Sequence, residues 1–405
     1  MKAPSKKVAI VGAGISGLSS AYFLSKFGCQ VEVFERRPTS GGLISTIETP
    51  KGLVETAANA FVDTELLQEI SRDIGVRLHS ALRESKRRYI YVDKKAQRWP
   101  LSLWETLKMI FILPLVKNKK PLAGETLSEW AIRALGAAVS LKLIAPAIQG
   151  IYAGSSERLS ASLVLSRLFD KSRKKSAVKR QSVAPKKGMG EWIKGMEAFL
   201  KKSGVVLHFG QAMDSENLLR LQKDFDVVLI ASSASCAASL LNKQFPCESR
   251  ALLNVSEMLP LTSVTTFCET DPKQIHGFGV LFAREEGITP LGVLFNSDIF
   301  ENRSSLRSET WIFSGVNHSK DSLESWIKES QRALYGKELV FRDLRVQTWP
   351  QALPYYSVEL EKYLRESSFQ SKFKQKKVYL VGNYLGRIGL SDLLEKSREV
   401  AKEIV

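Results

Sequence analysis

Length and composition indicate a folded protein of several domains with a strongly basic charge. The chain has 405 residues, of which 44% are hydrophobic and 25% are charged, a balance typical of globular rather than disordered proteins. At roughly 150 residues per domain, this length predicts two or three domains. The 59 Lys and Arg residues against 42 Asp and Glu residues give a net charge of +17. This charge favours an acidic partner, whether nucleic acid, anionic lipid or a substrate with several carboxylates, and does not choose among them.

The cysteines and histidines are too scattered to predict a disulfide scaffold or a metal site. No CxxC pair occurs, which fits a reducing compartment. The N-terminal residues show no signal-peptide pattern, and the most apolar run, residues 109–116, contains Pro114 and is shorter than the ~20 residues that span a bilayer. We therefore expect a cytoplasmic protein without a metal, and not an integral membrane protein. The residues concerned are Cys29, Cys236, Cys247, Cys268, His79, His208, His276 and His318.

The first 35 residues carry the order of elements that a dinucleotide-binding unit requires. Residues 8–11 form a continuous apolar run, typical of a strand buried on both faces. The glycine-rich residues 12–17 follow, then a predicted helix over 18–27 and a second strand over 31–34 that ends at Glu35. Strand, glycine turn, helix, strand and acid in this order predict a nucleotide site.

Each residue of this motif has a predicted role. Gly12 permits the tight turn, Gly14 permits the backbone to approach a pyrophosphate, and Gly17 permits the helix to pack closely on the strand. The helix start at Ile15 and Ser16 offers N–H groups and the positive end of the helix dipole to the phosphates. Glu35 lies about 20 residues beyond the last glycine, where an acid binds the ribose hydroxyls.

Two further glycine turns favour FAD over NAD. Arg36 and the pair Gly41-Gly42 come directly after the ribose acid, where a second backbone approach to the pyrophosphate of FAD is expected. Near the C-terminus, Gly382-Asn383 ends an apolar run, and a helix is predicted to start at Leu390, directly after Ile388 and Gly389. That helix start would face the flavin ring and stabilise negative charge on the reduced flavin.

The rest of the chain is predicted from its periodicity. Residues 101–168 show helical spacing, whereas residues 171–187 hold eight basic residues and no acidic one, and are predicted to be a solvated loop or hinge. A helix is expected over 192–200. Buried strands are expected over 205–209 and 226–232, with the second of them returning to the nucleotide-binding sheet, and a second sheet is expected within 261–313. A strand over 378–383 and a helix over 390–405 complete the chain.

The chain resembles the protoporphyrinogen oxidase family, a branch of the FAD-dependent amine oxidase superfamily. The segments that carry the resemblance run in order from end to end: VAIVGAGISGLSSAYFLSKFGCQVEVFE, ETAANAF, RRYIYVDKKAQRWPLS, PAIQGIYAGSSERLSAS, KKGMGEWIKGM, WPQALPYY and VYLVGNYLGRIGLSDLLEKS. The resemblance implies an α/β fold in which a Rossmann-like FAD-binding domain holds an inserted mixed-sheet substrate domain and a helical membrane-binding subdomain. The implied divisions are FAD-binding residues 1–80, 181–250 and 356–405, substrate-domain residues 81–100 and 251–355, and helical residues 101–180.

The resemblance also implies a reaction and its residues. A porphyrinogen, protoporphyrinogen IX or coproporphyrinogen III, would lose hydride to FAD and become the porphyrin of the haem pathway, with O2 reoxidising the flavin. Asn59 matches an asparagine that the family places beside the substrate, where its amide would orient the substrate; the alternative is a loop residue held by its own backbone bonds. Arg88 lies in a segment that matches the family and is the candidate partner for a substrate propionate; the alternative is one of several solvated cations beside Lys86 and Arg87. Ala231 and Trp349 match residues that contact the cofactor. No side chain need be a strong acid or base, because the flavin performs the chemistry.

Some positions depart from the family pattern and leave the substrate open. Ala57 and Ala58 stand where relatives carry glycine before the asparagine, Ser155 stands where aspartate is common, and Arg387 would bring an unusual cation near the flavin. The alternatives are an FAD oxidoreductase of the same fold acting on an amine or a polyene, or a flavin-bound scaffold without turnover. A nucleic-acid binder is set aside, because the basic stretch lacks interleaved aromatic residues.

The stretch 99–121 has two possible interpretations. Its apolar residues lie beside Lys108, Lys117, Lys119 and Lys120, a pattern that suits shallow insertion at an anionic lipid surface. A core helix with a basic end would give the same pattern. The first interpretation predicts peripheral attachment to the inner face of the membrane, and it admits transient contact with the next enzyme of the haem pathway. The oligomeric state is not predicted.

Overall fold

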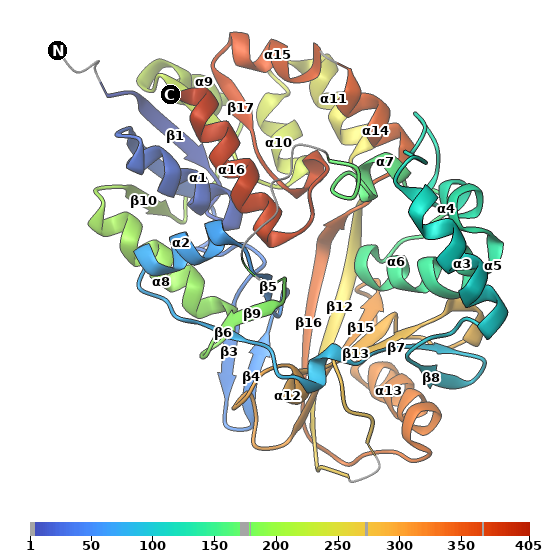
Figure 1. Ribbon diagram of the computed structural model, residues 1–405. Helices are drawn as coiled ribbons and strands as arrows, with labels where there is room; N and C mark the ends of the chain where they lie inside the picture. The colour runs from blue at the N-terminus through green and yellow to red at the C-terminus, as the bar shows by residue number, and fades with distance from the viewer. Residues whose placement is uncertain (1–4, 171–177, 179, 272–273, 367) are drawn as a thin grey trace.

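The computed structural model describes residues 5–170, 178, 180–271, 274–366 and 368–405. Two large sheets stand side by side, and a group of helices lies beyond the second one (Figure 1). The first sheet collects strands from the beginning, the middle and the end of the chain, and most strands of the second lie between them in sequence. The predicted α/β fold with an inserted sheet domain is confirmed.

All strands of the first sheet run parallel, in the order β10-β2-β1-β11-β17. Strands β1 and β11 are buried apolar runs, as the sequence predicts. Ile10 of β1 lies in register between Val33 and Leu229. Parallel strands require crossover connections, which place helices on both faces. The strands are β1 (Lys7–Val11), β2 (Gln30–Glu35), β10 (Val206–Phe209), β11 (Val227–Ile230) and β17 (Val378–Leu380).

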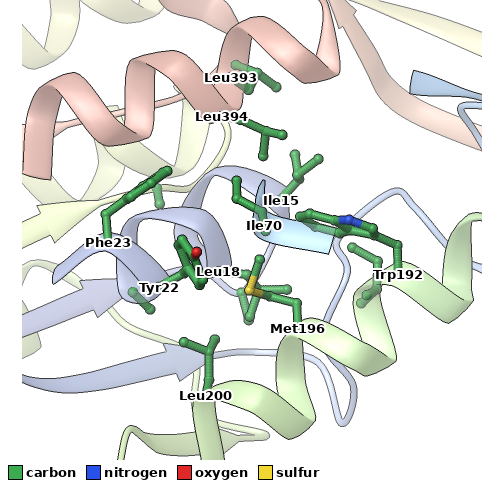
Figure 2. Packing of buried hydrophobic residues seen from close by; sticks show 14 of the residues in the cluster. Ile15, Leu18, Tyr22, Phe23, Ile70, Trp192, Met196, Leu200, Leu393 and Leu394 are labelled. Carbon is green, nitrogen blue, oxygen red and sulfur yellow. The ribbon is translucent and has the colours of Figure 1, made fainter. Parts of the chain in front are cut away.

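Helices cover the first sheet on both faces, and α1 packs between α8 and α16 on one of them (Figure 2). Leu18 and Tyr22 of α1 are fully buried there with Met196 of α8 and Leu394 of α16. This face carries α1 (Ile15–Lys26), α2 (Glu65–Asp73), α8 (Met189–Lys202) and α16 (Leu390–Ile404). The other carries α9 (Ser215–Asp224), α10 (Ala234–Leu241), α11 (Pro246–Val255) and α15 (Ser368–Gln375).

The second sheet has the order β16-β12-β15-β14-β13-β7-β8, and its one parallel pair is β13 with β7. Helix α13 (Lys320–Tyr335) packs on it through Leu323 and Ile327. The predicted second sheet is therefore present and extends further in both directions. Its strands are β7 (Arg88–Val92), β8 (Lys95–Gln97), β12 (Met258–Cys268), β13 (Gly279–Phe282), β14 (Gly292–Phe295), β15 (Arg307–Ser314) and β16 (Phe341–Pro354).

The stretch predicted to be helical is helical throughout its described elements. A single residue of α3, Met109, is buried, and the helix contains Pro114. No helix among the described residues combines the length and the apolar character needed to cross a membrane. The helices are α3 (Leu103–Val116), α4 (Leu127–Leu135), α5 (Ala137–Val139), a π-helical turn (Ser140–Ile144), α6 (Ala145–Tyr152) and α7 (Ala161–Val164).

The basic stretch 171–187 is not a loop throughout. Residues 171–177 and 179 lie outside the described residues, but Ser182–Pro185 forms strand β9 with Val183 and Ala184 buried. β9 lies between β5 (Phe61–Val62) and β6 (Leu78–Ser80). The loop prediction is wrong here because the partners of this strand lie about a hundred residues earlier, beyond the reach of local periodicity. The remaining elements are β3 (Thr46–Thr49), β4 (Gly52–Glu55), α12 (Asn296–Ile299), α14 (Val358–Arg365) and three short helical turns at Glu84–Lys86, Arg284–Glu286 and Asn383–Leu385.

Candidate active site

The three positions of the first loop are glycine for different structural reasons. Gly12 has φ 109°, and a Cβ there would lie 2.7 Å from the Ala231 carbonyl oxygen. A Cβ on Gly17 would lie 1.9 Å from the Gly12 carbonyl oxygen. A Cβ on Gly14 would meet no atom within 4 Å. Gly12 and Gly17 are thus required by packing, whereas Gly14 leaves an open surface that a ligand can approach.

Helix α1 leaves its first amides without a side-chain cap. Gly14 is its N-cap, no side chain of the described residues caps its first amides, and its first turn contains no acidic residue. Ile15 and Ser16 are buried at this end. The uncapped N–H groups and the positive end of the helix dipole are suited to binding a phosphate.

Glu35 closes the loop from the end of β2. Its Oε2 accepts a hydrogen bond from the Ala13 amide at 2.8 Å, and its Oε1 accepts one from the Arg37 amide at 2.9 Å. The side chain is buried. Each carboxylate oxygen can accept a second bond, so Glu35 can shape the loop and still bind ribose hydroxyls.

The second glycine pair contacts the first loop directly. The Gly41 amide donates to the Ala13 carbonyl at 2.8 Å, and Gly14 and Gly41 form an isolated parallel bridge. A Cβ on Gly42 would lie 3.2 Å from the Gly14 Cα. Two motifs that the sequence places 24 residues apart or more therefore form one continuous backbone surface.

Arg37 holds this surface together, and the sequence analysis did not single it out. The Arg37 Nη1 donates to the Gly42 carbonyl at 2.6 Å, and its guanidinium lies 5.2 Å from the ring of Trp349. The Trp349 indole N–H donates to the Thr56 carbonyl at 2.7 Å. Arg36 points to the surface and is exposed. Both arginines follow the end of β2 and carry the same charge, so the local sequence does not distinguish them.

The predicted C-terminal turn joins the same edge of the first sheet. β17 pairs with β11, and the Val381 amide donates to the Ile230 carbonyl at 3.0 Å, one residue before Ala231. Gly382 and Asn383 follow, and the Tyr356 hydroxyl donates to the Asn383 carbonyl. The turn therefore ends beside the first glycine loop.

Helix α16 begins after this turn, again without a side-chain cap. Its N-cap is Gly389, which Ile388 precedes, and its first residue is Leu390. The Ser397 hydroxyl of this helix donates to the Ser16 carbonyl at 3.1 Å, which joins α16 to the start of α1. Two uncapped helix starts thus flank one edge of the sheet. Arg387 is not directed there: its Nη1 lies 3.3 Å from Glu399 Oε1 on the outer side of α16.

Asn59 lines a small pocket that both halves of the molecule build. Both apolar and polar residues line the pocket, and Asn59 is partly buried. The loop that carries Asn59 is anchored at Thr56, whose hydroxyl donates to the Leu43 carbonyl at 2.7 Å and whose carbonyl binds Trp349. The lining residues are Leu53, Glu55, Asn59, Asn296, Ile299, Phe300 and Arg303.

A buried ion pair forms one side of this pocket. Arg303 Nη1 lies 2.8 Å from Glu55 Oε1, and both side chains are at most 6% exposed. Glu55 also accepts the Met189 amide at 2.9 Å and the Thr46 hydroxyl at 2.7 Å. Burial raises the pKa of Glu55, with the bonds from Thr46 and Arg303 opposing it. The pair joins the β3–β4 hairpin to the second sheet, and nothing in the local sequence indicates it.

Arg88 stands at the first position of β7 on the second sheet. Its side chain is exposed and its guanidinium lies 4.4 Å from the ring of Phe278. The Phe278 carbonyl accepts the Phe295 amide at 3.0 Å, and the next residue, Asn296, lines the Asn59 pocket. Arg88 is therefore connected to the pocket through two packed residues and does not line it.

The segment QGIYAGSSERLS packs against Tyr355 and Tyr356, the two residues that follow β16. A Cβ on Gly154 would lie 2.2 Å from the Tyr355 ring, whose hydroxyl donates to the Ser155 carbonyl at 2.9 Å. Tyr152 and Tyr356 have ring centroids 5.7 Å apart, and burial raises the pKa of Tyr152 to about 12. Both tyrosines are therefore neutral packing groups at ordinary pH.

Comparison with known proteins supports the resemblance. Residues 10–74 match a family model described as an NAD(P)-binding Rossmann-like domain. The chain is 24% identical to the chloroplastic protoporphyrinogen oxidase of Nicotiana tabacum, over 98% of this chain and 84% of that protein. It is 20% identical to the coproporphyrinogen III oxidase of Bacillus subtilis, over 98% of this chain and 97% of that protein.

Solved structures show the same fold at lower identity. A reduced UDP-galactopyranose mutase superposes with a TM-score of 0.74 at 13% identity, covering 99% of this chain and 94% of that one. The cyclohexylamine oxidase of Brevibacterium oxydans superposes with a TM-score of 0.69 at 13% identity, covering 99% of both chains. A mutase and an amine oxidase share this fold, so the fold does not fix the substrate.

The similarity to oxidases along almost the whole chain indicates an oxidoreductase, and its Rossmann-like first sheet carries a site for a flavin-type cofactor. It shares its fold with solved amine oxidases. Within that class, the resemblance to the protoporphyrinogen oxidase family is confirmed, because the similarity to proteins of that name runs along almost the whole chain.

Proposed function

We propose that this protein is an FAD-dependent oxidase that converts protoporphyrinogen IX or coproporphyrinogen III into the corresponding porphyrin in haem biosynthesis, with O2 as the final acceptor. The observation that carries the proposal is the end-to-end similarity to protoporphyrinogen and coproporphyrinogen oxidases. The pocket that Asn59 lines supports it. When bound, FAD would supply the acceptor for the hydride that leaves a bridging carbon.

The residues of the first sheet would hold the cofactor. The uncapped start of α1 and the backbone at Gly14 and Gly42 would receive the pyrophosphate, while Glu35 would accept bonds from ribose hydroxyls. The uncapped start of α16 after Gly389 would stabilise negative charge near the ring. Ala231 and Trp349 border these loops, as the contacts of Gly12 and Arg37 show.

The remaining residues would bind and orient the substrate. The Asn59 amide would fix one ring against the flavin, and Arg88 would bind a propionate at the exposed end of β7. The buried pair Glu55–Arg303 would keep the pocket wall rigid. Repeated oxidation at one place requires only proton shifts between imine and enamine forms of the substrate, and the protein's task is to exclude water and hold the geometry.

An anaerobic titration tests the proposal. The purified protein is reconstituted with FAD, its visible spectrum is recorded, and protoporphyrinogen IX, coproporphyrinogen III and cyclohexylamine are added in parallel. Bleaching of the flavin band is expected for a porphyrinogen and not for the amine, and the faster porphyrinogen names the substrate. Because the porphyrin requires the loss of six electrons and one flavin accepts two, porphyrin fluorescence is expected only after air is admitted, and then faster than in a control without protein. A flavin band that only the amine bleaches would contradict the proposal, and a band that none bleaches would favour the scaffold.

We also propose that the helical region contacts an anionic membrane surface. Leu103, Trp104 and Phe111 of α3 are 79%, 67% and 78% exposed. The Lys108 ammonium lies 5.8 Å from the Trp104 ring, and Lys117 follows at the end of the helix. Exposed aromatic and aliphatic side chains beside lysines favour interfacial binding to anionic lipid. The core-helix alternative does not fit a helix with one buried residue.

A further inference from the structure

The short helix α12 is fixed to the second sheet by nearly all of its polar side chains. Ser297 Oγ accepts the Ser308 amide at 2.8 Å, and Asp298 binds the buried Arg307 guanidinium at 2.8 Å. α12 therefore has one position relative to β15. A group that α12 presents to the pocket is held rigidly, which is what a binding site requires.

Asn296, the first residue of α12, has one side-chain polar atom without a hydrogen-bond partner among the described residues. Its Nδ2 donates to Ser308 Oγ at 3.1 Å and to Thr310 Oγ1 at 2.9 Å, so both N–H groups are used. Its Oδ1 is buried and accepts no hydrogen bond from the residues that the structure describes. A buried acceptor without a partner costs about 1–3 kcal/mol, and such groups in folded proteins call for an explanation.

Asn296 lines the same pocket as Asn59, from the opposite half of the molecule. The apolar side chains of Leu53, Ile299 and Phe300 line the pocket that the two amides share. The neighbouring charges of Glu55 and Arg303 neutralise one another. A carboxylate placed here would meet the Glu55 carboxylate and the Oδ1 of Asn296, so the pocket fits a neutral group that donates an N–H.

We propose that Asn296 is a second substrate-orienting residue, whose Oδ1 accepts an N–H of the substrate across the pocket from Asn59. This inference rests on the proposed function, in which the substrate carries pyrrole N–H groups and peripheral carboxylates. The carboxylates then point away from the Asn59 pocket, toward the exposed Arg88. A site with a buried acceptor discriminates strongly against ligands that lack the donor, because the acceptor is then left unpaired.

Anaerobic stopped-flow reduction of the FAD-loaded protein by protoporphyrinogen IX separates binding from chemistry. Asn296→Leu removes the acceptor at similar volume and is expected to raise the Kd for protoporphyrinogen about tenfold, as one lost hydrogen bond of about 1.4 kcal/mol implies. Asn296→Asp keeps an oxygen at the Oδ1 position and is expected to restore the Kd to within about threefold of the wild type.

Ser308→Ala is the matched structural control, because it breaks one of the bonds that hold the same amide but leaves Oδ1 in place. Both Ser308→Ala and Asn296→Leu should lower the melting temperature, whereas only Asn296→Leu should raise the Kd. An unchanged Kd in Asn296→Leu, or an equal rise in Ser308→Ala, would overturn this inference while wild-type flavin is still bleached. Wild-type flavin that protoporphyrinogen does not bleach would overturn the proposed function itself.

Discussion

Helices α1 and α3 begin in opposite ways, and the difference separates a ligand site from a surface. α3 starts at Ser102, whose hydroxyl accepts the Glu105 amide while the Glu105 carboxylate accepts the Ser102 amide. α1 starts at Gly14 without a side-chain bond. A helix that caps itself needs no ligand at its N-terminus, whereas one that leaves its amides free can bind an anion.

The two helices also differ in what they bury. Ten consecutive residues of α1, from Ile15 to Leu24, are buried, and packing alone stabilises it. α3 buries one residue and exposes its apolar side chains, so its own cap must stabilise it more. The first helix is built to hold a ligand inside the protein, and the second to present a surface outside it.

The largest expected effect comes from comparing Gly17, which packs against the backbone, with Gly14, which faces the open surface of the proposed cofactor site. Gly17→Ala brings a Cβ to 1.9 Å from the Gly12 carbonyl oxygen, a backbone clash that no side-chain rotation relieves, and should destabilise the flavin-free protein by about 3 kcal/mol. Gly14→Ala meets no protein atom within 4 Å. It should leave the melting temperature of the flavin-free protein unchanged and weaken FAD binding.

Thermal melting of flavin-free protein and fluorescence titration with FAD give the two quantities separately. Equal melting temperatures for the two variants would contradict the packing role of Gly17. Wild-type FAD affinity in Gly14→Ala would remove Gly14 from the cofactor site.

The neighbouring arginines provide the next comparison. Arg37→Ala removes a charge-assisted hydrogen bond to Gly42 and the contact with Trp349. At about 1.5–3 kcal/mol for such a bond, FAD affinity should fall roughly tenfold or more. Arg36→Ala removes the same charge from an exposed position and should change FAD affinity less than threefold. Titration of both variants checks this, and equal losses would mean that only the net charge matters.

These arginines also show which features of the site can be predicted from the sequence and which cannot. The glycine loop and Glu35 are predicted because their chemistry is local: the turn, the helix start and the acid lie within one short segment. The pair Glu55–Arg303 and the pocket residue Asn296 are missed because residues more than 200 positions apart meet there. Strand β9 is missed for the same reason. The resemblance supplied Asn59, yet only the structure shows which residues face it.

The exposed face of α3 is tested against an exposed apolar residue elsewhere. Trp104→Ser with Phe111→Ser should reduce sedimentation with phosphatidylglycerol vesicles at least tenfold, because each large side chain contributes about 1.5–3 kcal/mol when it leaves water. Leu253→Ser removes an exposed leucine of α11 and should have no effect. Equal sedimentation of all three proteins would show that the lysines and the net charge alone cause binding, and loss of binding in 0.5 M salt would then follow for each.

The cap of α3 gives the smallest expected effect, and its sign follows from the pKa of Glu105. The bond from the Ser102 amide, together with Lys142, lowers this pKa to about 2 from its ordinary value of 4.5. A depressed pKa in the folded protein means that the stabilisation is present above pH 4.5 and is lost as the pH falls toward 2.

Glu105→Gln keeps an oxygen for the Ser102 amide but does not titrate. Hydrogen-exchange protection of the first turn of α3 should therefore decrease between pH 5 and pH 3 in the wild type and stay constant in Glu105→Gln, while the first turn of α1, which contains no acid, should show no such dependence in either protein. A parallel decrease in both helices would mean that the whole chain, and not this cap, responds to acid.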